Sequence, residues 1–201
     1  MILKQGIEKF RQEQYPQLRE RFHHLANGQQ PRVLFITCSD SRIVPSLITQ
    51  TGPGDLFVIR NAGNLVPPFA AAAGSGESGS LEYAVSVLKV SDIVVCGHSD
   101  CGAMKAVVSP KSLDTLPEVK NWLRLATPTR QAVLARQGDD RVEYAIAHNV
   151  LTQLENLKTH PCVAARLAEG DLWLHGWVYH IASGQIDVLK SAQPEAVAVT
   201  G

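Results

Sequence analysis

Two short segments of this sequence carry side chains that could bind a metal ion. The first, at residues 37–42, contains Cys38, and the second, at residues 97–103, contains His98 and Cys101. Two thiolates and one imidazole form a donor set of borderline softness that suits zinc. Three protein ligands leave the fourth tetrahedral position for water or substrate, which is typical of a catalytic zinc site. If the two segments meet in space, they predict a catalytic metal centre.

Asp40 and Arg42 follow the first thiol and need a separate interpretation. Side chains two residues apart at the end of a strand can lie on one side, where a guanidinium can hold a carboxylate through two hydrogen bonds. One interpretation is an ordinary salt bridge. Beside a metal, an ionised Asp40 can instead accept a hydrogen bond from a zinc-bound hydroxide and orient it toward an electrophile. Arg42 would then keep Asp40 charged and in place.

The remaining cysteines, Cys96 and Cys162, are interpreted as structural. Cys96 could close the site as a fourth thiolate, but it continues an apolar run, and free cysteine commonly packs as a small hydrophobic residue. Four cysteines are too few for a disulfide scaffold. The other histidines have no matching partner motif and are assigned surface or core roles: His23, His24, His148, His160, His175 and His180.

Short apolar runs predict the strands that would position these residues. Residues 33–36, 56–59 and 93–96 are continuous apolar runs, which suit strands buried on both faces. A helical piece from about Pro45 separates the first two runs, and a helix with its N-cap at Ser80 separates the second from the third. This alternation predicts right-handed crossovers and a parallel sheet.

The two metal-binding segments begin where the first and third predicted strands end. In an open parallel sheet, ligands bind beyond the carboxyl ends of the strands, where the strand order reverses. An order of 2-1-3-4 makes the first and third strands neighbours at that point. We therefore expect Cys38, His98 and Cys101 to converge within a few ångströms. Cys101 would also begin a helix, whose dipole and free N–H groups favour an ionised sulfur.

The rest of the chain predicts helices that cover this sheet and strands that extend it. Helical patterns span residues 116–126 and about 139–158, a fourth strand spans residues 172–181, and residues 186–189 form a final strand. The segment at residues 70–80 is rich in alanine, glycine and serine and is expected to be a flexible loop. The predicted fold is α/β, with a mostly parallel sheet of order 2-1-3-4 plus a short C-terminal edge strand, flanked by helices.

A helical arm is expected ahead of the sheet. Residues 1–30 have apolar side chains at three- to four-residue spacing, with a break at Pro16. A chain of 201 residues is long enough for one domain and short for two, so residues 1–201 are expected to form a single domain.

The charge balance excludes several classes of partner. Lysine plus arginine and aspartate plus glutamate each number 19, so no net basic field is available to hold nucleic acid or an anionic membrane. The apolar stretches are shorter than the roughly 20 residues that a bilayer span needs, and residues 1–10 contain no signal-type apolar block. We expect a cytoplasmic protein that acts on a small molecule.

The two segments resemble the zinc motifs of the β-class carbonic anhydrases of bacterial and cyanobacterial type. Residues 38–42 and 98–102 match those motifs in order and with similar separation, and the pairing is highly specific. The similarity extends through residues 54–64, 82–84 and 175–179 and so covers most of the chain.

This resemblance implies roles for the residues singled out above. Cys38, His98 and Cys101 would be the ligands of Zn2+, and Asp40 with Arg42 would be the catalytic dyad. The family interconverts carbon dioxide and bicarbonate, so the expected enzyme is a carbonate dehydratase, a zinc lyase. Because two thiolates neutralise the charge of the metal, activity should rise toward alkaline pH with an apparent pKa above about 7.

The resemblance also implies an assembly. Family members build the site at a dimer interface and often join dimers, so a homodimer, a tetramer or a larger oligomer is expected. The N-terminal helices of the family commonly wrap a neighbouring subunit, which is the expected role of residues 1–30. Phe35 stands where members with an inhibitory bicarbonate pocket have Trp, which predicts that this pocket is absent or weak. Association with a carboxysome would be expected of a cyanobacterial chain.

Two other functions stay open at this point. A hydrolase of carbonyl sulfide or carbon disulfide on the same scaffold would use the same nucleophile, so the motifs do not exclude it. A catalytically inactive scaffold protein could use zinc only to hold its fold, although the presence of both Asp40 and Arg42 argues against it.

Overall fold

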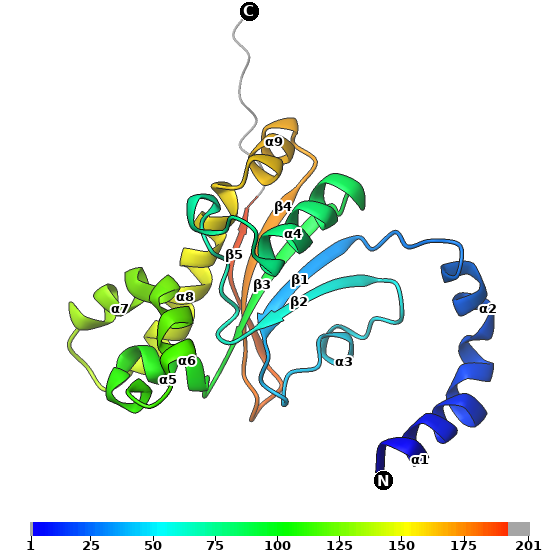
Figure 1. The fold of residues 1–201 in the computed structure, drawn as a ribbon, viewed down its shortest axis with the longest axis horizontal. Coiled ribbons are helices and arrows are strands. Elements are labelled where there is room, and N and C mark those ends of the chain that lie inside the picture. The colour runs from blue at the N-terminus through cyan, green and yellow to red at the C-terminus, as the bar shows by residue number, and fades with distance from the viewer. Residues whose placement is uncertain (1, 193–201) are drawn as a thin grey trace, which may run out of the picture.

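A five-stranded sheet of order β2-β1-β3-β4-β5 forms the centre of the protein in the computed structural model, which describes residues 2–192 (Figure 1). The first four strands are parallel, and the edge strand β5 is antiparallel to β4. This topology confirms the predicted α/β fold and its strand order. The strands are β1 (Val33–Cys38), β2 (Leu56–Asn61), β3 (Asp92–His98), β4 (Trp173–Tyr179) and β5 (Ile186–Ala192).

Burial along each strand explains why the apolar runs predicted the sheet. β1 and β3 lie inside the sheet and are buried at every residue after their first, as expected for strands covered on both faces. In β4 buried and half-buried residues alternate, because one of its faces is less covered. The runs of β1 and β3 therefore mark central strands, and the alternating run of β4 marks a strand nearer the edge. The expectation that residues 56–59 form a strand buried on both faces was wrong, because β2 is an edge strand and its Val58 is 41% exposed.

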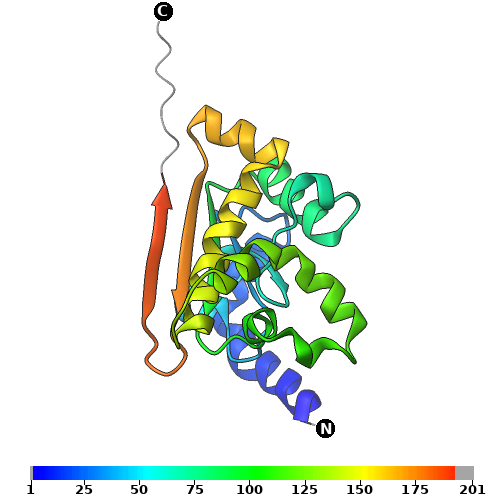
Figure 2. The same ribbon diagram turned by 90° about the vertical axis from the view of Figure 1, so that its left-hand side faces the viewer.

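Helices connect the strands and cover one face of the sheet, as Figure 2 shows from the side of β4 and β5. The long helix α8 packs across β3 and β4, and the apolar residues of its inner face are buried. The short helix α3 packs against the other face through Ile48. The described helices are α1 (Ile2–Lys9), α2 (Tyr15–Leu25), α3 (Pro45–Thr49), α4 (Gly76–Glu82), α5 (Gly102–Val108), α6 (Pro117–Trp122), α7 (Thr127–Leu134), α8 (Arg141–Lys158) and α9 (Pro161–Glu169), with shorter turns η1 (Phe10–Gln14), η2 (Phe69–Ala71), η3 (Tyr83–Val87), η4 (Pro110–Leu113) and η5 (Leu123–Ala126).

Two glycines allow α8 to approach the sheet closely. A Cβ atom built on Gly97 would lie 2.8 Å from Cγ2 of Val150, and one built on Gly176 would lie 3.0 Å from Val150 and Leu154. Both glycines lie in strands beneath α8, so the missing side chains make room for the helix. The close packing holds the carboxyl end of β3 against a rigid helix.

The N-terminal arm is helical, as predicted, but Pro16 does not break it. Pro16 lies in the first turn of α2, directly after the π-helical turn η1. Proline lacks an N–H group and its ring crowds the preceding turn, and a local π-helical turn can absorb both effects. The arm projects away from the sheet (Figure 1), and Arg21 ties it back through the carbonyl of Pro53 at 2.6 Å and the carboxylate of Asp55 at 2.5 Å.

The predictions of an N-cap at Ser80 and of a loop over residues 70–80 were wrong. Helix α4 begins at Gly76, where the hydroxyl of Ser75 accepts a hydrogen bond from the N–H of Ser78 at 3.1 Å. A serine hydroxyl at this position satisfies a free N–H group of the first turn, so the cap is effective despite the glycines that follow. The helix therefore starts five residues earlier than predicted.

Within residues 2–192, no helix combines the length and the apolar character that a membrane crossing requires.

Candidate metal centre

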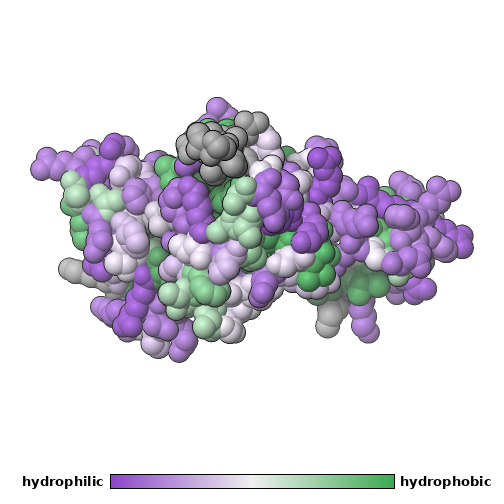
Figure 3. Space-filling view, turned by 90° about the horizontal axis from the view of Figure 1, so that it is seen from above, coloured by the Kyte–Doolittle hydropathy of each residue, from purple (hydrophilic) through white to green (hydrophobic). Residues whose placement is uncertain are grey.

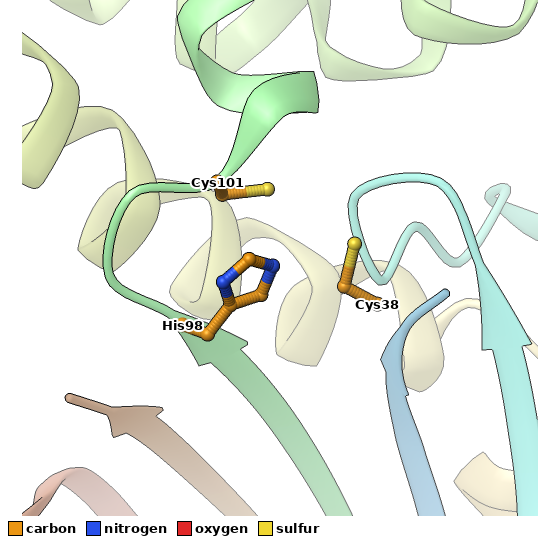
Figure 4. A group of neighbouring side chains, drawn as sticks. All are labelled: Cys38, His98 and Cys101. Carbon is orange, nitrogen blue, oxygen red and sulfur yellow. The ribbon is translucent and has the colours of Figure 1, made fainter. Parts of the chain in front are cut away.

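The carboxyl ends of β1 and β3 bring the three predicted metal ligands together. Cys38 is the last residue of β1, His98 is the last residue of β3, and Cys101 directly precedes α5. Because β1 and β3 are parallel neighbours, their ends lie at the same edge of the sheet. The candidate ligand atoms of the three side chains lie within 4.8 Å of one another. Figure 4 shows the two sulfurs and the imidazole ring directed toward one shared space.

The hydrogen bonds of His98 leave one ring nitrogen free to bind a metal. Nδ1 lies 2.8 Å from the carbonyl oxygen of Ser99, and a carbonyl can only accept, so Nδ1 carries the hydrogen. Nε2 then presents a lone pair. This atom is buried and has no hydrogen-bond partner among the described residues. A buried nitrogen lone pair without a partner, beside two sulfurs, fits a metal ligand.

The contact between the two thiols shifts their pKa values in opposite directions. The hydrogen bond from Cys101 is the main cause that lowers the pKa of Cys38 to about 4, against the opposing effect of burial. The same contact, together with burial, holds the pKa of Cys101 well above its usual range. The N–H groups at the start of α5 act in the opposite direction on Cys101, but more weakly. A dication that binds both sulfurs must displace the proton of Cys101.

A backbone N–H group also points at Cys38. The N–H of Gly63, in the loop after β2, donates to Cys38 Sγ at 3.4 Å. Gly63 has a φ of +84°, a left-handed conformation that favours glycine. Residues 54–64 resemble the β-class carbonic anhydrases, but the sequence did not predict a role for Gly63. Its only local signal is a glycine between Asn61 and Asn64 in the sequence.

Asp40 and Arg42 form the bidentate pair that their spacing allows. Arg42 Nε donates to Asp40 Oδ1 at 2.9 Å, and Nη2 donates to Oδ2 at 2.7 Å. These hydrogen bonds are the main cause that holds the pKa of Asp40 well below its usual range. Oδ2 of Asp40 also lies 3.9 Å from Nε2 of His98. An ionised carboxylate therefore lies beside the three candidate ligands.

Arg42 is held by a second carboxylate that sequence reasoning missed. Its Nη1 donates to Asp100 Oδ2 at 2.9 Å, and Asp100 also pairs with Lys105. Asp40 and then Asp100 raise the pKa of Arg42 beyond its already high value, so the guanidinium stays charged. Asp100 lies inside the second motif, but nothing in the local sequence indicates that it contacts Arg42, which is 58 positions away.

Arg60 is another functional residue that sequence reasoning missed. From β2 it donates to the carbonyl of Cys38 at 3.0 and 3.1 Å and to the carbonyl of Asp40 at 2.8 Å. The backbone that carries both the first thiol and the carboxylate is therefore fixed from the neighbouring strand.

Cys96 does not close the site. It is buried with Phe35 and Val94 in a separate apolar cluster and does not belong to the group of candidate ligands. Burial raises its pKa to about 12, so it stays a thiol. Cys162 lies in α9 and is also outside that group. Cys96 therefore packs in the core, as the sequence predicted, and the structural role of Cys162 stays a prediction.

The parallel sheet, with Cys38, His98 and Cys101 at the ends of two neighbouring strands, is the fold of a β-class carbonic anhydrase, as the similarity to solved structures of that class shows. The chain belongs to the carbonic anhydrase family, whose sequence model matches residues 33–186. As a member of that family it is an enzyme, a carbonate dehydratase of the lyase class, which confirms the predicted family and enzyme class.

Several relatives are similar over nearly the whole chain. The carbonic anhydrase of Synechococcus elongatus is 54% identical over 187 residues, which cover 90% of this chain and 68% of that protein. That of Pseudomonas aeruginosa is 52% identical over 197 residues, which cover 96% and 89%. The β-carbonic anhydrase CcaA has a TM-score of 0.89 at 47% identity and covers 96% of this chain and 98% of that one. A tetrameric β-carbonic anhydrase from Sordaria macrospora has a TM-score of 0.84 at 30% identity, covering 95% and 97%.

Proposed function

We propose that this chain catalyses the reversible hydration of carbon dioxide with a zinc ion held by Cys38, His98 and Cys101. The observation that carries the proposal is the placement of two sulfurs and one unpartnered, buried ring nitrogen within 4.8 Å of one another. The donor set suits zinc, and three ligands leave one tetrahedral position for water.

Zinc bound at these atoms would supply Lewis-acid chemistry, because it lowers the pKa of a water molecule at the open position. Asp40 accepts a hydrogen bond from the attacking water through its carboxylate, which directs a lone pair of that water toward the carbon of carbon dioxide. Arg42 holds both carboxylate oxygens and so keeps Asp40 ionised and oriented. Addition of the water oxygen to carbon and loss of one proton give bicarbonate.

Zinc content measured together with carbon dioxide hydration tests this proposal. The purified protein should contain about one zinc per chain and hydrate carbon dioxide in a stopped-flow assay. Cys101→Ala should lose the metal, the activity and part of the stability, because metal binding is coupled to folding. Cys96→Ala removes a buried thiol outside the candidate set and should keep both zinc and activity. A zinc-free, active protein would contradict the proposal.

The same preparation distinguishes the two alternatives. Faster turnover of carbonyl sulfide or carbon disulfide than of carbon dioxide would favour the hydrolase. Zinc at full occupancy without turnover of any of these gases would favour an inactive scaffold.

We further propose that residues 1–201 form one domain and that the arm, residues 1–30, packs on a neighbouring subunit in a homodimer or a larger assembly. Leu3 and Ile7 on the arm are 73% and 61% exposed, so no part of the described chain covers them. Figure 3 shows hydrophilic side chains over most of the face seen from above, with hydrophobic patches toward the arm. A groove of about 640 Å³, lined in part by Phe35, Leu56 and Trp177 of the sheet, offers an apolar surface. We also propose a cytoplasmic location, as the sequence predicts.

A further inference from the structure

One peptide group links helix α6 to the proposed metal ligand Cys38. The Ala62–Gly63 peptide donates through the N–H of Gly63 to Cys38 Sγ at 3.4 Å. The carbonyl of the same peptide, Ala62 O, accepts a hydrogen bond from Nε1 of Trp122 at 2.8 Å. Because a trans peptide is planar, its C=O and N–H point in opposite directions. The bond from Trp122 therefore sets the direction of the N–H that faces the sulfur.

The next peptide is held from the opposite side by α8. Asn149 Nδ2 donates to Gly63 O at 3.0 Å, and Asn149 is 1% exposed. Gln153 Nε2 donates to Asn149 Oδ1 at 2.9 Å, so the amide of Asn149 is oriented with its NH2 group toward Gly63. Gln153 Oε1 in turn accepts from the N–H of Val66 at 2.8 Å. The loop that carries Gly63 is therefore tied to a buried helix at two points.

Gly63 also leaves little room for a side chain. A Cβ atom there would lie 3.1 Å from Cβ of Ala103 and 3.2 Å from Cε of Met104, in the first turn of α5 that follows Cys101. The peptide thus lies directly against the helix that follows another proposed ligand. Movement of this peptide would disturb the positions of both sulfurs.

We propose that Trp122 is a positioning residue for Cys38 that acts through the Ala62–Gly63 peptide. Hydrogen bonds in a chain polarise one another, so donation to Ala62 O strengthens the N–H donor at the other end of the peptide. An N–H donor withdraws charge from a thiolate ligand and fixes its orientation, which tunes the metal it binds. The inference rests on the proposed role of Cys38 as a zinc ligand.

Trp122→Phe tests the inference, because it keeps an aromatic ring and removes the N–H donor. Trp173→Phe is the matched control, since Trp173 begins β4 and pairs with Asp92 at the far end of the sheet from the site. For each variant, zinc affinity is measured by competition with a chelator, and the cobalt-substituted protein is examined for its thiolate-to-cobalt charge-transfer band.

Trp122→Phe should weaken zinc binding by roughly three- to tenfold, less than the 10- to 100-fold typical of groups that contact a ligand directly, because Trp122 acts one bond further away. Its charge-transfer band should move to longer wavelength, because a thiolate that accepts a weaker hydrogen bond is oxidised more easily. Trp173→Phe should change neither measurement.

Unchanged zinc affinity and an unchanged band in Trp122→Phe would overturn the inference, as would equal changes in the two variants. If the phenylalanine variant does not fold, replacing the Trp122 indole by benzothiophene keeps the ring size, removes only the N–H and decides by the same measurements. Failure of the unmodified protein to bind zinc would instead overturn the proposed function.

Discussion

Asp40 and Arg42 show how neighbouring side chains fix the charge of a functional pair. Arg42 also donates to Asp40 through its backbone N–H at 3.0 Å, so one residue supplies three hydrogen bonds to a single carboxylate. The pKa of Asp40 moves down and that of Arg42 moves up, mainly because of these bonds. Neither group changes charge near neutral pH, which leaves the carboxylate permanently available as a hydrogen-bond acceptor.

Asp40→Asn should keep zinc and lose most of the hydration activity. An amide cannot accept two hydrogen bonds from a guanidinium with the same geometry, and its NH2 group donates where the carboxylate accepts. We expect a loss of roughly 100-fold or more in stopped-flow hydration, in the range of positioned acid–base groups. Asp92→Asn, which alters the carboxylate paired with His175 at the other end of β3, serves as the control. Near-normal turnover of Asp40→Asn would remove the pair from the mechanism.

The activity should rise from neutral toward alkaline pH, with an apparent pKa above about 7. A carboxyl with a lowered pKa is ionised at every pH above that value, and a guanidinium with a raised pKa is protonated at every pH below it. Asp40 and Arg42 therefore do not titrate in this interval, and the dependence reports the proton lost by the attacking water. Two thiolate ligands make that water a weaker acid than neutral ligands would. A flat kcat/KM profile across this interval would contradict the expectation.

The packing of α8 on β3 is the contact between elements that most directly supports the site. Val150 and Ile146 of the helix lie over Gly97, the residue before the proposed ligand His98. Asn149 and Gln153 of the same helix hold the loop that faces Cys38. One helix therefore supports both the strand and the loop from which the metal centre is built.

Gly97→Ala should lower the free energy of unfolding by about 1–3 kcal/mol, because the added methyl group would overlap Val150 and overpack the core. Gly79→Ala is the matched control in the interior of α4, where a Cβ atom meets nothing within 4 Å. That variant should raise the free energy by about 0.5–1 kcal/mol, because alanine is a better helix former than glycine. Urea unfolding measures the free energy of unfolding of both variants. If Gly97→Ala raised it as Gly79→Ala does, the approach of α8 to the sheet would not depend on Gly97.

At the scale of the whole molecule, the arm has apolar side chains that the described chain leaves uncovered. Phe10 packs edge-on against Tyr15 and Phe22, yet it is still 38% exposed. Arg21 anchors the arm to the loop before β2 through Pro53 and Asp55. An anchored arm with an exposed apolar surface suits the proposed packing on a second subunit.

Ile7→Asp combined with Phe10→Asp should weaken self-association by at least about 100-fold, equal to roughly 2.8 kcal/mol, because the interface would have to bury two carboxylates. Sedimentation at decreasing protein concentration measures the change. Glu8→Gln alters an exposed polar residue of the same helix and should leave the mass unchanged. An unchanged oligomer in the double variant would show that the arm does not contribute to the interface.

Some features of this fold could be predicted because they depend on local sequence. The continuous apolar runs of β1 and β3 are long enough to identify buried strands, and the carboxyl ends of parallel neighbours lie at the same edge of the sheet. The cap at Ser75 and the uninterrupted arm at Pro16 were missed, because serine and proline each fit more than one position in such segments. Local patterns predict that an element exists better than they predict where it begins.

The sequence by itself predicted the α/β fold and the three candidate ligands, because apolar runs and the residue types at their ends are local features, and its two motifs carried the resemblance to the family. The convergence of Cys38, His98 and Cys101 depended on an assumed strand order of 2-1-3-4, which the tertiary structure confirmed. Only the tertiary structure revealed that Asp100 also binds Arg42 and that Arg60 donates to the backbone carbonyl of Asp40. It also revealed the peptide group that accepts a hydrogen bond from Trp122 and donates one to Cys38. These contacts join residues 20 to 60 positions apart, and some of them use backbone groups that every residue has. A backbone N–H gains a specific role only from its place in space, which no residue type records.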